Sequence, residues 1–345
     1  MIVAIQPDTL GSADDRDNSA RRWAALLADA GHDVRHVDVF QPDILEQLRG
    51  CHGFMWRHAH VSHDRLVAKR LLPVIEHDLG LCVYPDQKTC WHYDDKVAQW
   101  YLLQAHDIPI PQTWVFWDEK DAMAFLKDAQ YPLVMKLAGG AGSQNVRKID
   151  TAAQAHHWLK KLFSAGVFAL GAFGKTRRET IDQKLRSSVK KLLGRETEYW
   201  YELHKNYVIL QEFLPGNEFD TRVTVIGNRA FAYRRFNRAN DFRASGSGNF
   251  SPAPGEIDLE TVRLAFRLAS RLGTQSVAVD GLRRGEDRVV GEISYTYVSW
   301  MVQSAPGHWE MQGNPETGKL AWCEGHMWPE EAQIQDFLAR LKSRA

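Results

Sequence analysis

Residues 207–225, YVILQEFLPGNEFDTRVTV, limit most tightly what this chain can fold into. Four apolar residues open the stretch and predict a buried strand, and a second strand resumes at residues 223–225. A Pro-Gly-Asn turn lies between them, surrounded by polar side chains. One interpretation is a β-hairpin with a charged tip. The other is a strand that ends at Gln211 and a bend at Leu214, whose backbone amide and carbonyl groups bind the edge of a planar heterocycle between Phe213 and Leu214.

Length and charge narrow the class of protein. With 345 residues the chain can form two or three domains. Lys+Arg and Asp+Glu both number 43, so nothing in the charge favours nucleic acid or an anionic membrane as partner. The four cysteines are far apart, which disfavours a disulfide framework and favours a reducing compartment. No signal peptide or membrane-spanning run is visible, so we expect a cytoplasmic protein.

The first 88 residues alternate between strand and helix patterns, which predicts a parallel sheet with helices on its faces. Strands are expected at residues 2–5, 34–40 and 53–56, and Gly31 is expected just after the first helix. Ligands of such sheets bind at the carboxyl ends of strands, here near Trp56, Arg57, His58 and His60. The histidine spacing matches no common zinc pattern, so we interpret these histidines as solvent-facing or substrate-facing.

Two lysines occupy positions suited to phosphate binding. Lys96 lies in the first turn of a helix expected at residues 94–105. Lys136 ends an apolar strand and precedes a glycine-rich loop that contains Gly140, Gly142 and Ser143. A lysine in such a strand must be paired or exposed, and glycines let backbone N–H groups close over phosphates. The alternatives are a surface lysine and an ordinary glycine-rich hairpin.

Two carboxylates predict a metal site. Strands expected at residues 276–280 and 288–293 bring Asp280 and Glu292 side by side on antiparallel strands. Adjacent carboxylates repel each other unless a cation lies between them. Arg234, Arg235, Arg238 and Arg243 lead into a loop of small residues at 244–248, which indicates an anion site or a basic loop without ligand. An amphipathic basic helix expected at residues 178–193 is either a docking surface for an acidic partner or a solvated face.

The order of these elements resembles the ATP-grasp superfamily, which includes D-alanine–D-alanine ligase, glutathione synthetase and enzymes that add glutamate to protein tails. Four motifs carry the resemblance across residues 90–300: the Asp-Lys helix followed by HDIPIPQT, the strand-Lys-glycine loop, Gln-Glu-x-Leu, and Asp with Glu-x-Ser. It implies an α/β fold (α+β ATP-grasp), with a Rossmann-like pre-ATP-grasp domain at 1–90 and two ATP-grasp lobes at 91–205 and 206–345.

The resemblance also implies ligands and roles, with ATP and Mg²⁺ as cofactors and Mn²⁺ as the alternative metal. The implied adenine and ribose ligands are Gln211, Glu212, Phe213, Leu214 and Glu218. The implied phosphate ligands are Lys96, Lys136, Gly140, Gly142 and Ser143. The implied metal ligands are Asp280, Glu292 and Ser294, where the family usually has Asn in place of Ser294. Arg222, Arg235 and Arg243 would contact the γ-phosphate and the acyl phosphate.

The implied activity is an ADP-forming ligation of a carboxylate and an amine through an acyl phosphate. The alternatives are a kinase on the same fold, acting on a small-molecule or sugar hydroxyl, and a nucleotide-binding protein without turnover. The expected partners are small-molecule carboxylate and amine substrates, including acidic or carbohydrate-linked ones, and neither nucleic acid nor membrane. A homodimer is compatible with the sequence, which does not define the oligomeric state.

Overall fold

The computed structural model describes residues 1–8, 18–140, 145–167 and 202–344, and the chain falls into two compact units. Unit 1 consists of residues 1–93, 101–110 and 216–345, and unit 2 of residues 94–100 and 111–215. Unit 1 thus combines most of the first and third predicted domains. The division into three domains stays a prediction. The expected basic helix at residues 178–193 lies outside the described residues.

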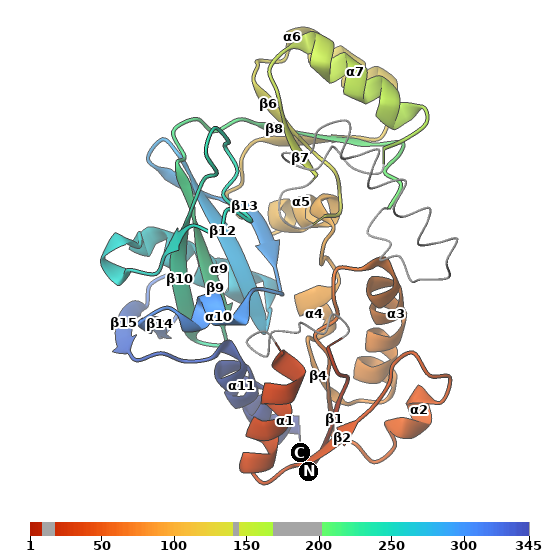
Figure 1. The fold of residues 1–345 in the computed structure, drawn as a ribbon, viewed down its shortest axis with the longest axis vertical. Coiled ribbons are helices and arrows are strands. Elements are labelled where there is room, and N and C mark those ends of the chain that lie inside the picture. Colours follow the sequence, from red (N-terminus) through yellow and green to blue (C-terminus); the bar gives the residue numbers. More distant parts are fainter. Residues whose placement is uncertain (9–17, 141–144, 168–201, 345) are drawn as a thin grey trace. The chain divides into compact units, whose positions relative to one another are not determined.

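A four-stranded parallel sheet forms the N-terminal part of unit 1, as the alternating pattern predicts (Figure 1). Its strands, in spatial order, are β2 (Asp33–His36), β1 (Ile2–Ile5), β3 (Gly53–Met55) and β4 (Cys82–Tyr84). Its helices are α1 (Ser19–Asp29), α2 (Ile44–Gln47), α3 (Ser62–Pro73), a π-helical turn η2 (Val74–Asp78) and α4 (Gln87–Cys90). Asn18 caps α1 by accepting a hydrogen bond from the Arg21 N–H. Gly31 follows α1 with φ +78°, which confirms its predicted place.

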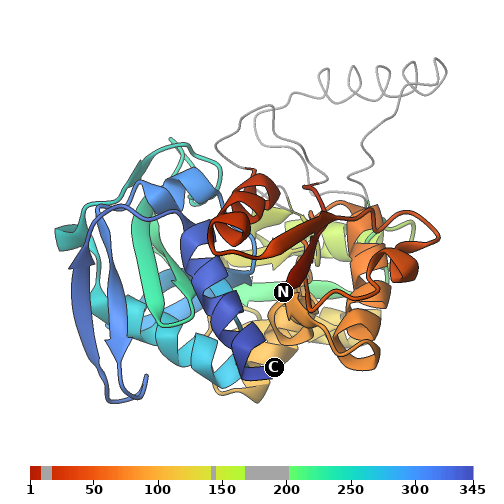
Figure 2. The same ribbon diagram turned by 90° about the horizontal axis from the view of Figure 1, so that it is seen from below.

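The last helix, α11 (Pro329–Arg344), covers one face of this sheet beside α1, as both views show (Figures 1 and 2). Trp23 donates its indole N–H to Gln333 Oε1 at 2.8 Å. A Cβ on Gly53 would lie 2.6 Å from Phe337 Cζ, so the helix packs directly on the strand backbone. The buried apolar residues of this interface include Val3, Ile5, Trp23, Leu27, Ile334, Phe337 and Leu341.

Unit 1 also contains a larger sheet of seven described strands. In spatial order they are β13 (Asp287–Ser294), β12 (Ser276–Arg284), β9 (Phe219–Ile226), β10 (Arg229–Phe236), β14 (Gly307–Gln312) and β15 (Lys319–Glu324), with β11 (Phe250–Ser251) paired to β10. The helices of this part are η3 (Pro254–Glu256), α9 (Leu259–Leu272) and α10 (Ser299–Gln303). Alternate residues of the central strands, among them Val223, Val225, Val277 and Val279, pack in one apolar cluster with α9. The opposite face is therefore available for polar side chains.

Unit 2 is built on an antiparallel sheet of four described strands. In spatial order they are β5 (Thr113–Phe116), β8 (Val208–Glu212), β6 (Leu133–Lys136) and β7 (Val146–Ile149). Helices α6 (Glu119–Asp128) and α7 (Ala152–Phe163) pack against one face through Met135 and Leu210. The first turn of α5 (Lys96–Ala105) also belongs to unit 2.

The polar stretch at residues 207–225 is not a hairpin. β8 pairs with β5 and β6, whereas β9 pairs with β10 and β12, so the two strands belong to different sheets. The predicted strand end at Gln211 is also wrong by one residue. β8 continues to Glu212, whose N–H donates to the Gln112 carbonyl at 2.8 Å, because the chain before β5 extends the pairing. Among the described helices, none is long and apolar enough to cross a membrane.

Candidate functional site

The face of the large sheet opposite α9 carries a ladder of alternating acids and arginines. Arg222 stands opposite Asp280 in the β9–β12 register, and Arg235 stands opposite Asp220 in the β9–β10 register. Arg222 donates two hydrogen bonds to the Asp280 carboxylate, at 2.7 and 2.9 Å. Arg235 donates two hydrogen bonds to the Asp220 carboxylate, at 2.7 and 2.6 Å, and its Nη2 also lies 2.7 Å from Asp280 Oδ2. The four side chains form one connected, formally neutral network.

Asp280 is held ionised by this network. It is only 7% exposed, and burial raises its pKa, but the Arg222 and Arg235 guanidiniums outweigh burial, so its pKa lies well below the ordinary value. A carboxylate has about four acceptor positions. The three guanidinium contacts use one position on Oδ1 and two on Oδ2, which leaves room for one further ligand on Oδ1.

Glu292 lies directly opposite Asp280 in the β12–β13 register, which confirms the predicted adjacency of the two carboxylates. A bulge follows Asp280, and a Cβ on Gly281 would meet Thr261 Cγ2 at 2.4 Å. Carboxylate oxygens are the ligands that Mg²⁺ prefers in proteins, so this pair fits such an ion through one oxygen each. The Ser294 hydroxyl instead accepts a hydrogen bond from the Thr296 N–H at 3.2 Å.

Two further predicted site residues of unit 1, Arg243 and Glu218, form hydrogen bonds with residues outside the network of Asp280 and Asp220. Arg243 is 6% exposed, and its Nε donates to both oxygens of Asp241 at 3.1 and 3.2 Å. The Glu218 side chain is exposed, and its backbone carbonyl accepts a hydrogen bond from the Asn237 N–H. The roles of Arg222, Arg235, Arg243, Glu218 and Ser294 stay predictions.

In unit 2, the sheet face opposite α6 and α7 carries Lys136 and Gln211. Lys136 pairs with Ile209 and Gln211 with Val134, so both side chains share the face that Ile209 occupies. The N–H of Lys96 donates to the Ala138 carbonyl at 2.9 Å, and its Nζ donates to the Gly140 carbonyl at 3.3 Å. The fold therefore gathers Lys96 and the start of the glycine-rich loop, which follows directly after Lys136.

The start of this loop depends on two side chains that the sequence analysis did not single out. Asp94 accepts a hydrogen bond from the Gly140 N–H at 2.8 Å, and Asn145 donates to the Gly139 carbonyl at 2.7 Å. Gly140 has φ +116°, and a Cβ there would lie 2.5 Å from Asn145 Nδ2, so only glycine fits. The signal for Asp94 was its position just before the helix cap Asp95, which accepts from the Val97 N–H. Gly142 and Ser143 lie outside the described residues.

The predicted adenine ligands have partners within the small sheet. Gln211 donates from Nε2 to Thr113 Oγ1 at 2.7 Å, and Glu212 Oε1 accepts from the Gln112 N–H at 2.7 Å. The Lys148 ammonium lies 4.9 Å from the centre of the Phe213 ring. Adenine binding by Gln211, Glu212, Phe213 and Leu214 stays a prediction.

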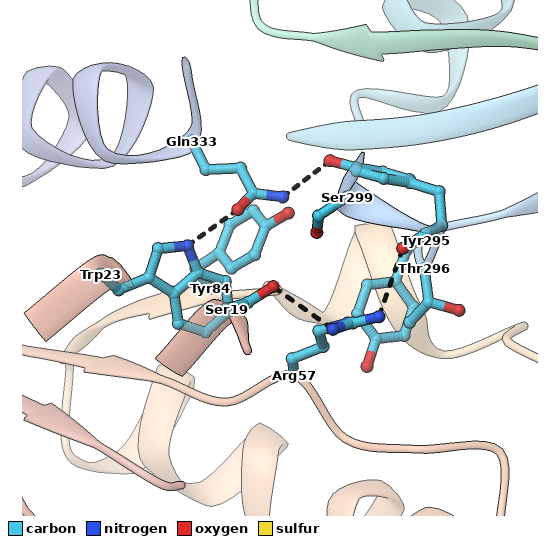
Figure 3. A pocket seen from close by; sticks show the side chains of 9 residues that line it. Ser19, Trp23, Arg57, Tyr84, Tyr295, Thr296, Ser299 and Gln333 are labelled. Atoms are coloured by element: carbon cyan, nitrogen blue, oxygen red, sulfur yellow. Dashed lines mark hydrogen bonds between the residues drawn. The ribbon is translucent and has the colours of Figure 1, made fainter. Parts of the chain in front are cut away.

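A small cavity lies at the carboxyl end of β3, within unit 1 (Figure 3). Arg57 crosses it and donates to Ser19 Oγ at 3.4 Å and to the Tyr297 carbonyl at 3.2 Å. The other lining residues are Trp23, Tyr84, Tyr295, Thr296, Ser299 and Gln333. Its volume of about 10 Å³ suits one water molecule rather than a substrate.

His58 is neither solvent-facing nor substrate-facing, so that interpretation is wrong for this residue. It is 3% exposed and packs against the rings of Trp56, Tyr93 and Tyr295. Burial lowers the pKa of His58 to about 3, which keeps the imidazole neutral.

Comparison with known proteins identifies the fold. No family model matches the chain. Among solved structures, D-alanine–D-alanine ligase from Bacillus anthracis in complex with ATP superposes with a TM-score of 0.55 at 13% identity, covering 100% of this chain and 98% of that one. The ATP-grasp ligase PsnB in complex with minimal precursor, Mg and ADP gives a TM-score of 0.55 at 15% identity, covering 99% and 98%. The chain has the ATP-grasp fold.

The chain is also similar in sequence to a curated ligase. The alpha-aminoadipate–LysW ligase LysX of Saccharolobus solfataricus is 24% identical over 221 residues. The alignment covers 64% of this chain and 66% of the relative, just under two thirds of its length. The predicted ATP-grasp resemblance and the α/β fold class are confirmed.

Proposed function

We propose that this ATP-grasp protein is an ATP- and Mg²⁺-dependent ligase that joins a carboxylate to an amine and releases ADP. The observation that carries the proposal is the paired Asp280 and Glu292, set on a polar sheet face where arginines hold Asp280 ionised. The relatives named above as ligases support the same class of reaction.

The proposed reaction has two steps. A substrate carboxylate oxygen attacks the γ-phosphorus of ATP, which forms an acyl phosphate and releases ADP. The amine then attacks the acyl carbon, an amide bond forms, and inorganic phosphate leaves with the proton passing to solvent. Such reactions depend on positioning and charge stabilisation more than on covalent chemistry by the protein.

Residues of both units contribute to the proposal. In unit 2, Lys96 and Lys136 bind phosphate oxygens as point charges near the glycine-rich loop. In unit 1, Asp280 and Glu292 would hold magnesium through carboxylate oxygens, and the ion would supply positive charge that offsets the charge of phosphate groups. Arg222 and Arg235 act by holding Asp280 ionised and correctly oriented.

The substrates are proposed at the level of chemical class. The name of one relative gives alpha-aminoadipate and LysW, and PsnB is known in complex with a minimal precursor and with a precursor peptide. We therefore propose small carboxylates and amines, with peptide-borne groups as a second set to screen.

An ADP-release assay with carboxylate and amine pairs tests the proposal. Lys136→Ala or Glu292→Gln should each lower turnover by about 10²-fold or more, since each removes charge stabilisation of the transferred phosphoryl group. Lys127→Ala and Glu286→Gln, which alter exposed residues of the same types, are the matched controls.

The assay separates the proposal from its alternatives. A new amide in the product supports a ligase, whereas a phosphate ester on a hydroxyl would indicate a kinase. Near-normal ADP release by Glu292→Gln would overturn the metal assignment. Nucleotide binding without any turnover would indicate a binding protein. In that case the Ser294 hydroxyl, which accepts a hydrogen bond from the Thr296 N–H, would not serve as a metal ligand.

A further inference from the structure

A second group of metal-ligating side chains lies on the opposite half of the large sheet from Asp280. His308 and Glu310 belong to β14 and Cys323 to β15, with β9 and β10 between them and β12. Within the described residues, these three side chains form a group whose ligand atoms all lie within 4.8 Å of one another. The reaction proposed above uses none of them.

Strand register brings the three residues together. His308 lies directly opposite Cys323 in the β14–β15 pair, and Glu310 is two residues further along β14 on the same face. His308 Nε2 lies 3.7 Å from Glu310 Oε1, too far for a hydrogen bond. Two ligands of one tetrahedral zinc ion, each at about 2.0–2.3 Å from it, are about 3.2–3.8 Å apart. The observed spacing therefore already suits a shared metal ion.

The burial of His308 is a second and independent observation. The residue is 7% exposed, and its ring packs on Phe231 with 5.2 Å between ring centres. Its Nδ1 is buried without a hydrogen-bond partner in the described part of the chain. Glu310 and Cys323 are only partly buried, which leaves a path for an ion from solvent.

We propose that His308, Glu310 and Cys323 bind one zinc-class divalent cation, with a water molecule in the fourth position. On binding, the Cys323 S–H bond breaks, its proton passes to solvent, and the sulfur lone pair forms the bond to the metal. The imidazole nitrogen and one carboxylate oxygen donate the other two pairs. Thiolate and imidazole select zinc-class ions over magnesium, so the site is independent of the proposed ligase metal.

Arg229 is compatible with this site. Its Nε lies 3.7 Å from Glu310 Oε1, the same oxygen that lies 3.7 Å from His308 Nε2. A carboxylate oxygen has two acceptor positions, so Oε1 can face the guanidinium with one and a metal ion with the other. The positive charge of Arg229 also offsets part of the negative charge of Glu310 and the metal-bound thiolate. The bound ion would tie β14 to β15, the last strand of the sheet.

Cobalt titration of the full-length, chelator-treated protein tests the proposal. With Mg²⁺ in excess, Co²⁺ should bind at one equivalent with a thiolate-to-cobalt charge-transfer absorption, and Zn²⁺ should displace it. Cys323→Ser should abolish the band and weaken Zn²⁺ binding more than about 100-fold, since loss of outer-shell partners alone costs about 10–100-fold. Glu310→Gln should weaken binding but keep the band.

Two matched controls complete the design. Cys51→Ser removes a cysteine elsewhere in unit 1, and Glu324→Gln alters an exposed carboxylate next to Cys323; both should retain the band and the affinity. Circular dichroism checks that each variant is folded. The proposal is overturned if the wild-type protein shows no thiolate band, if the band persists in folded Cys323→Ser, or if Mg²⁺ displaces the ion. Should Cys323→Ser fail to fold, unchanged Zn²⁺ affinity in Glu310→Gln would overturn it equally.

Discussion

Replacing Asp220 by Asn should strongly destabilise unit 1, because it removes one acid from a buried network of two acids and two arginines. Asp220 is 8% exposed and accepts two hydrogen bonds from Arg235 at 2.7 and 2.6 Å. Without this charge, Arg235 and Arg222 must share Asp280. Two opposite charges about 4 Å apart attract each other by about 4 kcal/mol at an effective dielectric constant of about 20. Breaking a buried pair from one side costs about 3–5 kcal/mol, and we expect a loss in that range.

Removing both partners should cost less. Asp220→Leu combined with Arg235→Met leaves the Arg222–Asp280 pair intact and no uncompensated charge. Replacing both members of a buried ion pair by apolar groups often leaves the free energy of unfolding nearly unchanged. We therefore expect the double variant to be more stable than Asp220→Asn, with a coupling free energy of several kcal/mol.

Urea unfolding followed by tryptophan fluorescence measures both effects. With a slope of about 3 kcal/mol/M, a loss of 3–5 kcal/mol lowers the midpoint by about 1–1.7 M at an unchanged slope. Asp287→Asn, at an exposed position, is the control and should leave the midpoint unchanged. The reasoning fails if Asp220→Asn shifts the midpoint by less than about 0.3 M. It also fails if the double variant loses as much stability as Asp220→Leu and Arg235→Met, measured singly, lose together.

Three further predictions concern His58, Gly140 and Gly53. Because the pKa of His58 is lowered to about 3 in the folded state, the unfolded state binds more protons below pH 6.5, so stability falls as pH decreases from about 6.5 to 3. At pH 5 this amounts to about 2 kcal/mol, and His58→Phe should lose that part of the pH dependence of the urea midpoint; identical profiles would refute it. Gly140→Ala should cost about 1–3 kcal/mol through its φ of +116° and its clash with Asn145, and should reduce the thermal shift caused by an ATP analogue; an unchanged shift would argue against a role of the loop in phosphate binding. Gly53→Ala should destabilise the protein by its 2.6 Å contact with Phe337, and Phe337→Leu should relieve part of that loss when the two are combined; simple additivity of the two losses would count against the contact.

Local patterns were sufficient to predict much of the fold. Alternation of strand and helix patterns predicted the parallel sheet. The strands expected at residues 276–280 and 288–293 correctly placed Asp280 and Glu292 opposite each other. Such features depend on residues close in sequence, where turn chemistry fixes the register.

Contacts between distant strands could not be predicted in the same way. Nothing in residues 207–225 indicates that β8 and β9 join different sheets, since that depends on pairing with β5, β6, β10 and β12. Arg222 and Arg235 were expected to face phosphates, but their partners in the structure are Asp280 and Asp220, which come from other strands. His58 was misjudged because a polar residue after a strand carries no sign of the aromatic rings that later enclose it.

The packing of α11 on the first sheet has a consequence for synthesis of the protein. Trp23 and Gln333 are 310 residues apart, so this face of the first sheet is covered by α1 alone until residues 329–344 have left the ribosome. Closing a loop of that length costs about 5 kcal/mol of chain entropy, which the contacts of α11 must outweigh. The apolar residues around Val3 and Ile5 are meanwhile exposed to other proteins. A nascent chain stalled before residue 329 should therefore bind chaperones through its N-terminal sheet, although the sequence of that sheet is complete.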